Sequence, residues 1–235
     1  TGAHMGFASW TVSYNCMSMC QANRWDDVSS QCANAVIGLQ STCLAGDAPS
    51  CFNSRNHMWF SWPNGRGYKS KCAGVAIGLP TRKFGKKCVR SVYTPKHKDL
   101  LGRIGAVRVK SSNCDVCYIS GYALSCPSQT DLWLVELFWN EINQIIAQLP
   151  ERCTPVLLID ANAKLGLREG LLDNALPLRN MGQFARAETD TNGEYFARLL
   201  STQHMAAVNS QFFTGSTFYH CGGRYSSTVD YICLP

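Results

Sequence analysis

The chain has 235 residues, of which 46% are hydrophobic, and 22 lysines and arginines against 16 acidic residues give it a formal net charge of +6. These values suit one folded domain with an ample core and exclude a disordered chain. No apolar run approaches the roughly 18 residues that a membrane-spanning helix needs, so we expect neither a membrane protein nor a membrane partner.

The predicted elements are short strands interrupted by a few helices. Residues 1–5 resemble a cloning remnant, and residues 6–235 are predicted to form one domain. Apolar alternation and short apolar runs predict strands at 7–15, 35–39, 57–62, 72–79, 88–93, 105–110, 116–122, 155–159, 206–208, 217–219 and 228–233. Helical spacing predicts helices at 23–33, 131–149 and 193–203, with a polar stretch at 47–55 and a long loop at 166–190. Strands in sequential groups predict a four-layer α/β (α+β) fold, a two-sheet β-sandwich flanked by helices.

Thirteen cysteines are spread through the chain. Many lie inside apolar runs, and the start of the sequence lacks the basic and apolar regions of an export signal. We therefore expect reduced thiols and an intracellular protein. Two pairs, Cys114 with Cys117 and Cys16 with Cys20, have a spacing suggestive of zinc ligands. No second short pair lies at a finger-like distance from Cys114 and Cys117, so a zinc site is not expected.

One apolar strand, 156–159, leads directly into two polar residues, Asp160 and Asn162. Strand alternation would place both side chains on the same side. The aspartate can accept a proton from water, and the asparagine amide can donate to a phosphoryl oxygen. The alternative is an Asx turn that merely closes the strand, and for this segment alone it is the more common structure.

Several other segments complete a pattern. Strands end in Tyr14-Asn15 and in Ile119-Ser-Gly-Tyr122, a long helix leads into Asp160, Asn192-Gly193 opens the next helix, and Thr228-Val-Asp230-Tyr-Ile closes the chain. In this order the segments resemble the endonuclease/exonuclease/phosphatase superfamily. More narrowly, they resemble the apurinic-type endonuclease domain of non-LTR retrotransposons. The resemblance covers nearly all of residues 6–235.

The resemblance implies a role for each of these polar residues. Asp160 would act on the attacking water or the metal, and Asn162 would contact the phosphate. Tyr122 would contact the scissile phosphate, and Asn15 would orient the catalytic acid pair. Asp230 would hold a catalytic histidine in its useful tautomer, as the third group of a triad does.

The sequence departs from the family pattern in ways that bear on activity. Ile159 and Ala161 replace the usual glycine and phenylalanine around the aspartate. Ser41 stands where the family has the glutamate that binds Mg²⁺, so Mg²⁺ (or Mn²⁺) is expected to bind weakly if at all. The family's last strand, which carries Ser-Asp-His, would lie beyond Pro235. Four remaining histidines match no motif and are expected in loops or at the surface: His57, His97, His204 and His220.

Basic residues are concentrated between positions 82 and 110, where Asp99 is the one acid. Such a cluster neutralises phosphates without regard to base sequence. The alternative is a solvated loop, but on segments leading to Tyr122 it is better interpreted as one wall of a DNA groove. The residues that we expect to bind nucleic acid are Arg82, Lys83, Lys86, Lys87, Arg90, Lys96, Lys98 and, near the end of the chain, Arg224.

These features predict a Mg²⁺-dependent DNA endonuclease, or nickase, of retrotransposon type whose catalysis is impaired. Two alternatives remain: a non-catalytic nucleic-acid-binding remnant of the same fold, and a phosphatase for a small phosphate ester. The resemblance further implies DNA or RNA as partner, a nuclear location, and a fused reverse transcriptase in a longer polyprotein.

Overall fold

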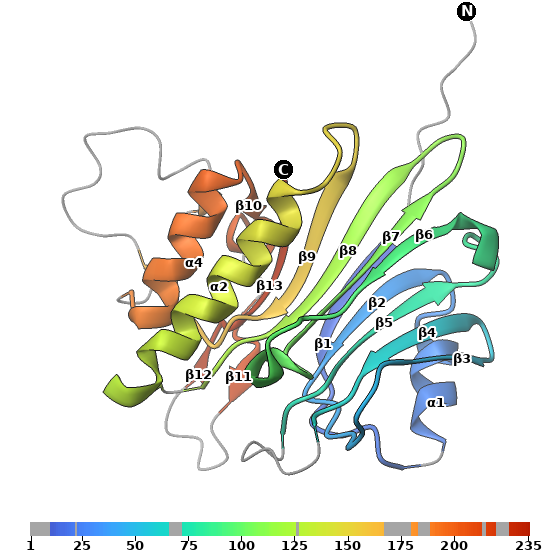
Figure 1. Ribbon diagram of the computed structural model, residues 1–235, viewed down its shortest axis with the longest axis horizontal. Coiled ribbons are helices and arrows are strands. Elements are labelled where there is room, and N and C mark those ends of the chain that lie inside the picture. Colours follow the sequence, from blue (N-terminus) through green and yellow to red (C-terminus); the bar gives the residue numbers. More distant parts are fainter. Residues whose placement is uncertain are drawn as a thin grey trace, which may run out of the picture.

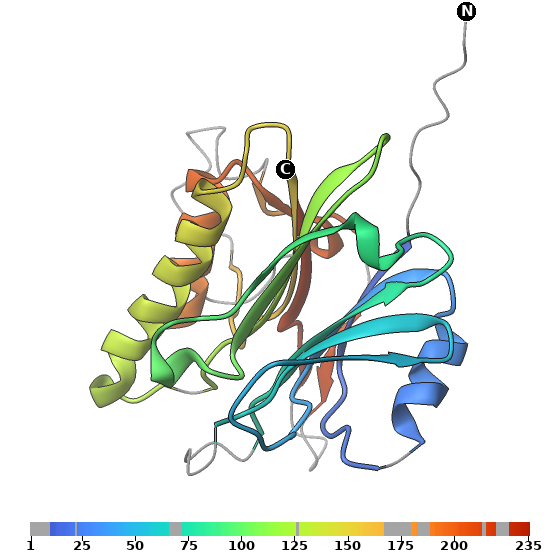
Figure 2. The same ribbon diagram turned by 45° about the vertical axis from the view of Figure 1, so that its right-hand side comes forward.

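Two β-sheets pack face to face at the centre of the molecule, with helices on both outer faces (Figures 1 and 2). The computed structural model describes residues 10–21, 23–65, 72–125, 127–166, 180–182, 189–212, 215–219 and 226–235. Helix α1 covers one sheet, and α2 and α4 cover the other. The expected four-layer sandwich is therefore confirmed. Among the described helices, none is long and apolar enough to cross a membrane.

The first sheet has five strands in the order β1-β2-β5-β4-β3. Their bounds are β1 Trp10–Asn15, β2 Ala35–Gln40, β3 Ser50–Ser54, β4 His57–Trp62 and β5 Val75–Pro80. Strands β1 and β2 are parallel, and the other pairs are antiparallel. Strand β3 lies within the stretch expected to be merely polar. That expectation was wrong, because an edge strand open to water needs no run of apolar residues.

The second sheet has six strands in the order β10-β13-β9-β8-β7-β6. Their bounds are β6 Val89–Tyr93, β7 Ile104–Lys110, β8 Asp115–Tyr122, β9 Thr154–Asp160, β10 Ala206–Ala207 and β13 Asp230–Leu234. Only β8 and β9 run parallel among these described pairs, because α2 connects them as a crossover. A small hairpin pairs β11 Phe218–Tyr219 with β12 Ser226–Ser227.

The helices are short except for α2. Their bounds are α1 Arg24–Gln31, α2 Leu132–Ala147 and α4 Thr191–Thr202, with 3-10 turns at Lys86–Cys88, Lys98–Leu100, Gln129–Asp131 and Val208–Ser210. The apolar stripe predicted for the long helix is buried against the second sheet. Asp190 caps α4 by accepting a hydrogen bond of 2.8 Å from the backbone N–H of Gly193. Residues 167–179 and 183–188 of the expected long loop lie outside the described part.

His57 contradicts the expectation of a loop or surface histidine. It begins β4, is fully buried, and its Nε2 lies 2.9 Å from the carbonyl oxygen of Ala35. Burial lowers the pKa of this imidazole, so it is neutral at physiological pH. A histidine that matches no motif can still be buried, because the neighbouring strands determine whether its side chain reaches solvent. His57 is therefore a structural histidine of the first sheet.

Glycine at position 105 allows the two sheets to approach each other. A Cβ atom there would lie 2.2 Å from the buried indole of Trp62. We expect Gly105→Ala to lower the free energy of unfolding by about 1–3 kcal/mol, because the ring has no space into which to move. Gly85→Ala is the matched control, since a Cβ at Gly85 meets nothing within 4 Å. Urea unfolding of both variants checks this, and equal midpoints would contradict it.

Candidate active site

Four strands bring polar side chains to one edge of the sandwich. Asp160 ends β9, where Tyr122 of β8 lies beside it on one side and Asp230 of β13 on the other. Asn15 ends β1 in the opposite sheet, and its Nδ2 donates a hydrogen bond of 2.6 Å to Oδ2 of Asp160. Residues 145 positions apart in the chain, one from each sheet, therefore meet at a single carboxylate.

The Asp160 carboxyl group is almost entirely buried, with 2% of the residue exposed. Besides Asn15, it accepts a hydrogen bond of 3.1 Å on Oδ1 from the backbone N–H of Asn162. Burial, followed by the facing carboxylate of Asp230, raises the pKa of Asp160 to about 7, although both hydrogen bonds oppose that rise. Near neutral pH, Asp160 is consequently poised to exchange a proton with water.

Asp230 is half-buried beside Asp160, and burial likewise raises its pKa. The hydroxyl of Thr217 accepts a hydrogen bond of 3.2 Å from its backbone N–H, and the amide of Asn209 donates to its carbonyl oxygen at 2.9 Å. Its Oδ1 is buried and makes no hydrogen bond to any residue that the structure describes. An acceptor in that position is suited to an N–H donor entering the site.

Asn162 is positioned by a turn, which corrects the expectation from strand alternation. Strand β9 ends at Asp160, and Asn162 has a left-handed backbone with φ of 43°. Its Nδ2 donates a hydrogen bond of 3.0 Å to the carbonyl oxygen of Ala123. The Asx turn weighed as the alternative is present, because Asp160 accepts from the backbone of Asn162. One amide hydrogen of Asn162 is therefore used to hold the loop.

Tyr122 presents a phenol next to a cation. Burial is the largest of several effects that raise its pKa to about 12, so the phenol remains protonated and can donate a hydrogen bond. The guanidinium of Arg103 lies 5.8 Å from the centre of the ring and donates a hydrogen bond of 3.2 Å to the Tyr122 carbonyl oxygen. Arg103 is 6% exposed, and the sequence had placed it only in the basic stretch between positions 82 and 110, without a role at the site.

Two buried side-chain amides, those of Asn192 and Gln40, form hydrogen bonds with the segments that carry the site residues. The sequence alone had assigned neither of them a role. Asn192 of α4 donates to the carbonyl oxygens of Leu124 at 2.7 Å and Asn162 at 3.2 Å, and accepts from the indole of Trp139 at 3.2 Å. Gln40 of β2 donates across the sandwich to the hydroxyl of Ser120 at 3.2 Å. The sequence signal that could have identified both residues is a polar side chain within a segment that otherwise contributes to the core.

Ser41 and its surroundings do not fit a Mg²⁺ site. The side chain is 5% exposed, lies beside the phenol of Tyr122, and has its hydroxyl 3.9 Å from the thiol of Cys43. Mg²⁺ prefers carboxylate oxygens, and this position offers a neutral hydroxyl and a neighbouring thiol. Within the described residues, no group of three or more histidine, cysteine, aspartate or glutamate side chains could hold a metal ion.

The predicted basic wall is divided between opposite ends of the strands. Strand β5 ends at Pro80, which pairs with the first residue of β4, so Arg82, Lys83, Lys86, Lys87 and Arg90 lie around the connection at the end remote from Asp160. Lys96 and Lys98 follow the end of β6, at the same edge as Tyr122, and both are exposed. The single wall expected from the sequence is wrong, because β6 runs from the remote end of the sheet to the edge that carries Tyr122 and so separates the two groups of basic residues. Arg224 lies outside the described residues.

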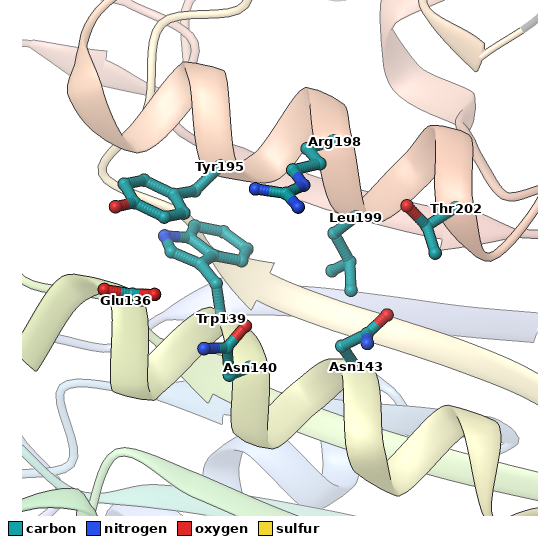
Figure 3. A pocket seen from close by; sticks show the side chains of 8 residues that line it. All are labelled: Glu136, Trp139, Asn140, Asn143, Tyr195, Arg198, Leu199 and Thr202. Carbon is teal, nitrogen blue, oxygen red and sulfur yellow. The ribbon is translucent and has the colours of Figure 1, made fainter.

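A separate polar cavity of about 180 Å³ lies between α2 and α4 (Figure 3). It is lined by Glu136, Trp139, Asn140, Asn143, Tyr195, Arg198, Leu199 and Thr202. None of these residues belongs to the edge around Asp160.

The raised pKa of Asp160 predicts a dependence of stability on pH. The folded state holds this proton more tightly than the unfolded chain, whose aspartate pKa is near 3.8. The contribution of this bound proton to the free energy of unfolding is therefore complete below about pH 4 and is lost as the pH rises through about 7. Relative to Asp160→Asn, the wild-type chain should lose on the order of 2 kcal/mol between pH 5 and pH 8. Parallel stability curves for the two proteins would contradict this.

No family model matches the chain, and no curated protein matches it. Solved structures do match. The endonuclease domain of TRAS1, a telomere-specific non-LTR retrotransposon, superposes with a TM-score of 0.58 and 15% identity over 97% of this chain and 85% of its own. AP endonuclease LMAP from Leishmania major gives a TM-score of 0.63 and 11% identity over 96% and 77%. The 3' phosphatase NExo from Neisseria, bound to product DNA hairpin, gives 0.61 and 15% over 95% and 84%.

At these identities the similarity establishes the fold. The chain has the α/β-sandwich fold of the endonuclease/exonuclease/phosphatase superfamily, which the order of its sequence segments had indicated. A retrotransposon endonuclease domain is among the structures that share it.

Proposed function

We propose that this chain is a nucleic-acid phosphodiesterase of the retrotransposon endonuclease type whose metal-dependent catalysis is impaired. The contact of 2.6 Å between the Asn15 amide and the Asp160 carboxylate, with Asp230 paired opposite, carries the proposal. Such a constellation at the rim of a sandwich can hold a water molecule and a phosphate between strand ends. The three structural neighbours are all named for nuclease or phosphatase action, which supports this substrate class.

In this proposal Asp160 positions the attacking water and accepts its proton, a role for which a pKa of about 7 is suitable. The protonated phenol of Tyr122 donates a hydrogen bond to a phosphoryl oxygen, whose negative charge grows as the water attacks. The guanidinium of Arg103 adds positive charge next to that phenol. Asp230 offers its buried Oδ1 to a donor that would be oriented toward the same phosphate.

We attribute the impaired catalysis to Ser41, which stands at the position of the metal-binding glutamate of the family. A divalent ion supplies several kcal/mol of charge stabilisation to phosphoryl transfer, and the residue that would bind it in the family is replaced by a hydroxyl. We propose that Mg²⁺ or Mn²⁺ binds weakly. A non-catalytic nucleic-acid-binding protein of the same fold is the second candidate, favoured by Ser41 and by the side-chain amide of Asn162 donating to the Ala123 carbonyl oxygen. DNA as partner, a nuclear location and a reverse transcriptase in the same polyprotein are part of the proposal.

Nicking of supercoiled plasmid, with and without Mg²⁺, tests the function. We expect slow nicking by the wild-type chain, lost in Asp160→Asn and little changed by Asn140→Ala, an exposed residue of α2 outside the edge around Asp160. Complete inactivity with retained DNA affinity would favour the non-catalytic candidate. Fast Mg²⁺-dependent nicking that disappears in Asp160→Asn would contradict the impairment.

Lys96 and Lys98 lie at the edge of the site, and Lys86 and Lys87 lie at the remote end of the strands. We therefore expect the first pair, and not the second, to contact nucleic acid. Replacing Lys96 and Lys98 together with glutamine should weaken binding to duplex DNA and reduce the slope of log affinity against log salt concentration by about 2, roughly one for each phosphate that is no longer neutralised. The matched control replaces Lys86 and Lys87, which lie at the remote end of the strands. Fluorescence anisotropy across a salt series measures both slopes, and equal effects of the two pairs would overturn the assignment.

A further inference from the structure

Exposed and half-exposed thiols gather beside the edge that carries Asp160. The turn after β2 places Cys43 next to the segment that leads into β5, because the Cys43 N–H donates to the Ala73 carbonyl oxygen at 3.1 Å and the Thr42 N–H to that of Gly74 at 3.0 Å. The two segments are so close that a Cβ atom on Gly74 would lie 2.2 Å from the hydroxyl of Thr42. Cys72 directly precedes this contact.

The side chains in this region favour one pair of sulfurs. Burial raises the pKa of the Cys43 thiol, and the thiol of Cys72 raises it further through its charge and through a side-chain hydrogen bond, whereas Cys20 acts through its charge alone. Cys20 also lies near Cys43, and its thiol donates to the Cys43 carbonyl oxygen at 3.4 Å. Cys16 is buried, and its thiol donates to the Gln40 carbonyl oxygen at 3.1 Å. Cys72 is therefore the natural partner of Cys43.

We propose that Cys43 and Cys72 form a reversible disulfide beside the site when the protein meets a peroxide. The exposed sulfur of Cys72 attacks one peroxide oxygen, which breaks the O–O bond and gives a sulfenic acid and water. The sulfur of Cys43 then displaces the sulfenic hydroxyl, so that the S–S bond forms and a second water leaves. Overall, two thiols lose two electrons and two protons, and the peroxide is reduced to water.

The disulfide would fasten the turn that bears Ser41 to the segment before β5. Ser41 and Cys72 both lie close to the phenol of Tyr122, so the link would fix the residues on one side of the site. The modification does not depend on nuclease activity, and its test needs no substrate. It adds a site of oxidation to a chain in which the described cysteines are all free thiols.

Peptide mapping of the whole protein tests the proposal. The reduced chain is treated with hydrogen peroxide, alkylated and digested without reductant, and linked peptides are identified by mass spectrometry. We expect Cys43–Cys72 as the dominant link, with a mass two hydrogens below the sum of the free peptides, and its loss after dithiothreitol. Cys43→Ser and Cys72→Ser should each abolish the link, whereas Cys51→Ser, an exposed thiol on the edge strand β3, should retain it.

Two results would overturn the proposal. One is a dominant link between Cys43 and Cys20, and the other is oxidation of Cys72 to the sulfinic acid without any link. A thermal melt gives a second readout, because a crosslink restricts the unfolded chain. The oxidised wild type should melt at a higher temperature than its reduced form, and the two forms of Cys72→Ser should melt together.

Discussion

Asn192→Ala should lower the free energy of unfolding by about 3–5 kcal/mol, because it removes a buried amide that satisfies three other groups. The substitution leaves the carbonyl oxygens of Leu124 and Asn162 and the indole N–H of Trp139 without this partner inside the protein. It also leaves a small void beneath α4. In a chain of this size, a loss of that magnitude lowers the melting temperature by roughly 6–20 °C.

Asn140→Ala provides the control for this prediction. Asn140 is an exposed asparagine on α2, so its replacement should change stability by no more than about 0.5 kcal/mol. Differential scanning calorimetry of both variants makes the comparison. If Asn192→Ala melts within a few degrees of the wild type, the amide does not anchor the loop that carries Asn162.

Ser41→Glu should introduce a response to Mg²⁺. A carboxylate at this position would lie beside Tyr122 and close to Asp160, where two acidic groups and a phosphate could share a divalent ion. We expect Mg²⁺ to raise the melting temperature of this variant and to increase plasmid nicking at least tenfold, roughly the effect of 1.4 kcal/mol on a barrier. The left-handed backbone of Ser41, with φ of 57°, will cost the variant some stability.

Ser41→Gln separates charge from size in this experiment. Glutamine has the shape of glutamate without its charge, so it should give neither a Mg²⁺-dependent rise in melting temperature nor faster nicking. Identical behaviour of the two variants would show that the missing carboxylate is not the main defect. Titration with Mn²⁺ followed by electron paramagnetic resonance measures the metal affinity directly and does not depend on turnover.

Much of the site could be predicted because strand ends are visible in the sequence. Asn15, Tyr122 and Asp160 are each the last residue of a strand, and their order along the chain indicated the fold. Asp230 pairs with Asp160 because β13 returns antiparallel to β9. Local patterns place these residues at strand ends, and the fold brings those ends to one edge.

Other features depend on contacts that no local pattern records. The basic residues form one run in sequence, but β6 carries the chain along the sheet, so that Lys96 and Lys98 lie at the edge remote from Lys86 and Lys87. His57 is buried because neighbouring strands enclose it, and the motif comparison could not indicate that. Asn192 reaches Asn162 across 30 positions, so its role follows only from the packing of α4.

The facing pair formed by Asp160 and Asp230 is the centre of the proposed site, and an NMR titration of the aspartate side-chain carboxyl carbons tests it directly. We predict one aspartate that titrates near pH 7, is missing in Asp160→Asn, and moves to lower pH in Asp230→Asn, because the facing negative charge is then absent. If Asp160 instead titrates close to its ordinary value of 3.8 in the wild-type chain, the carboxyl group is open to water and the proposed site is not assembled.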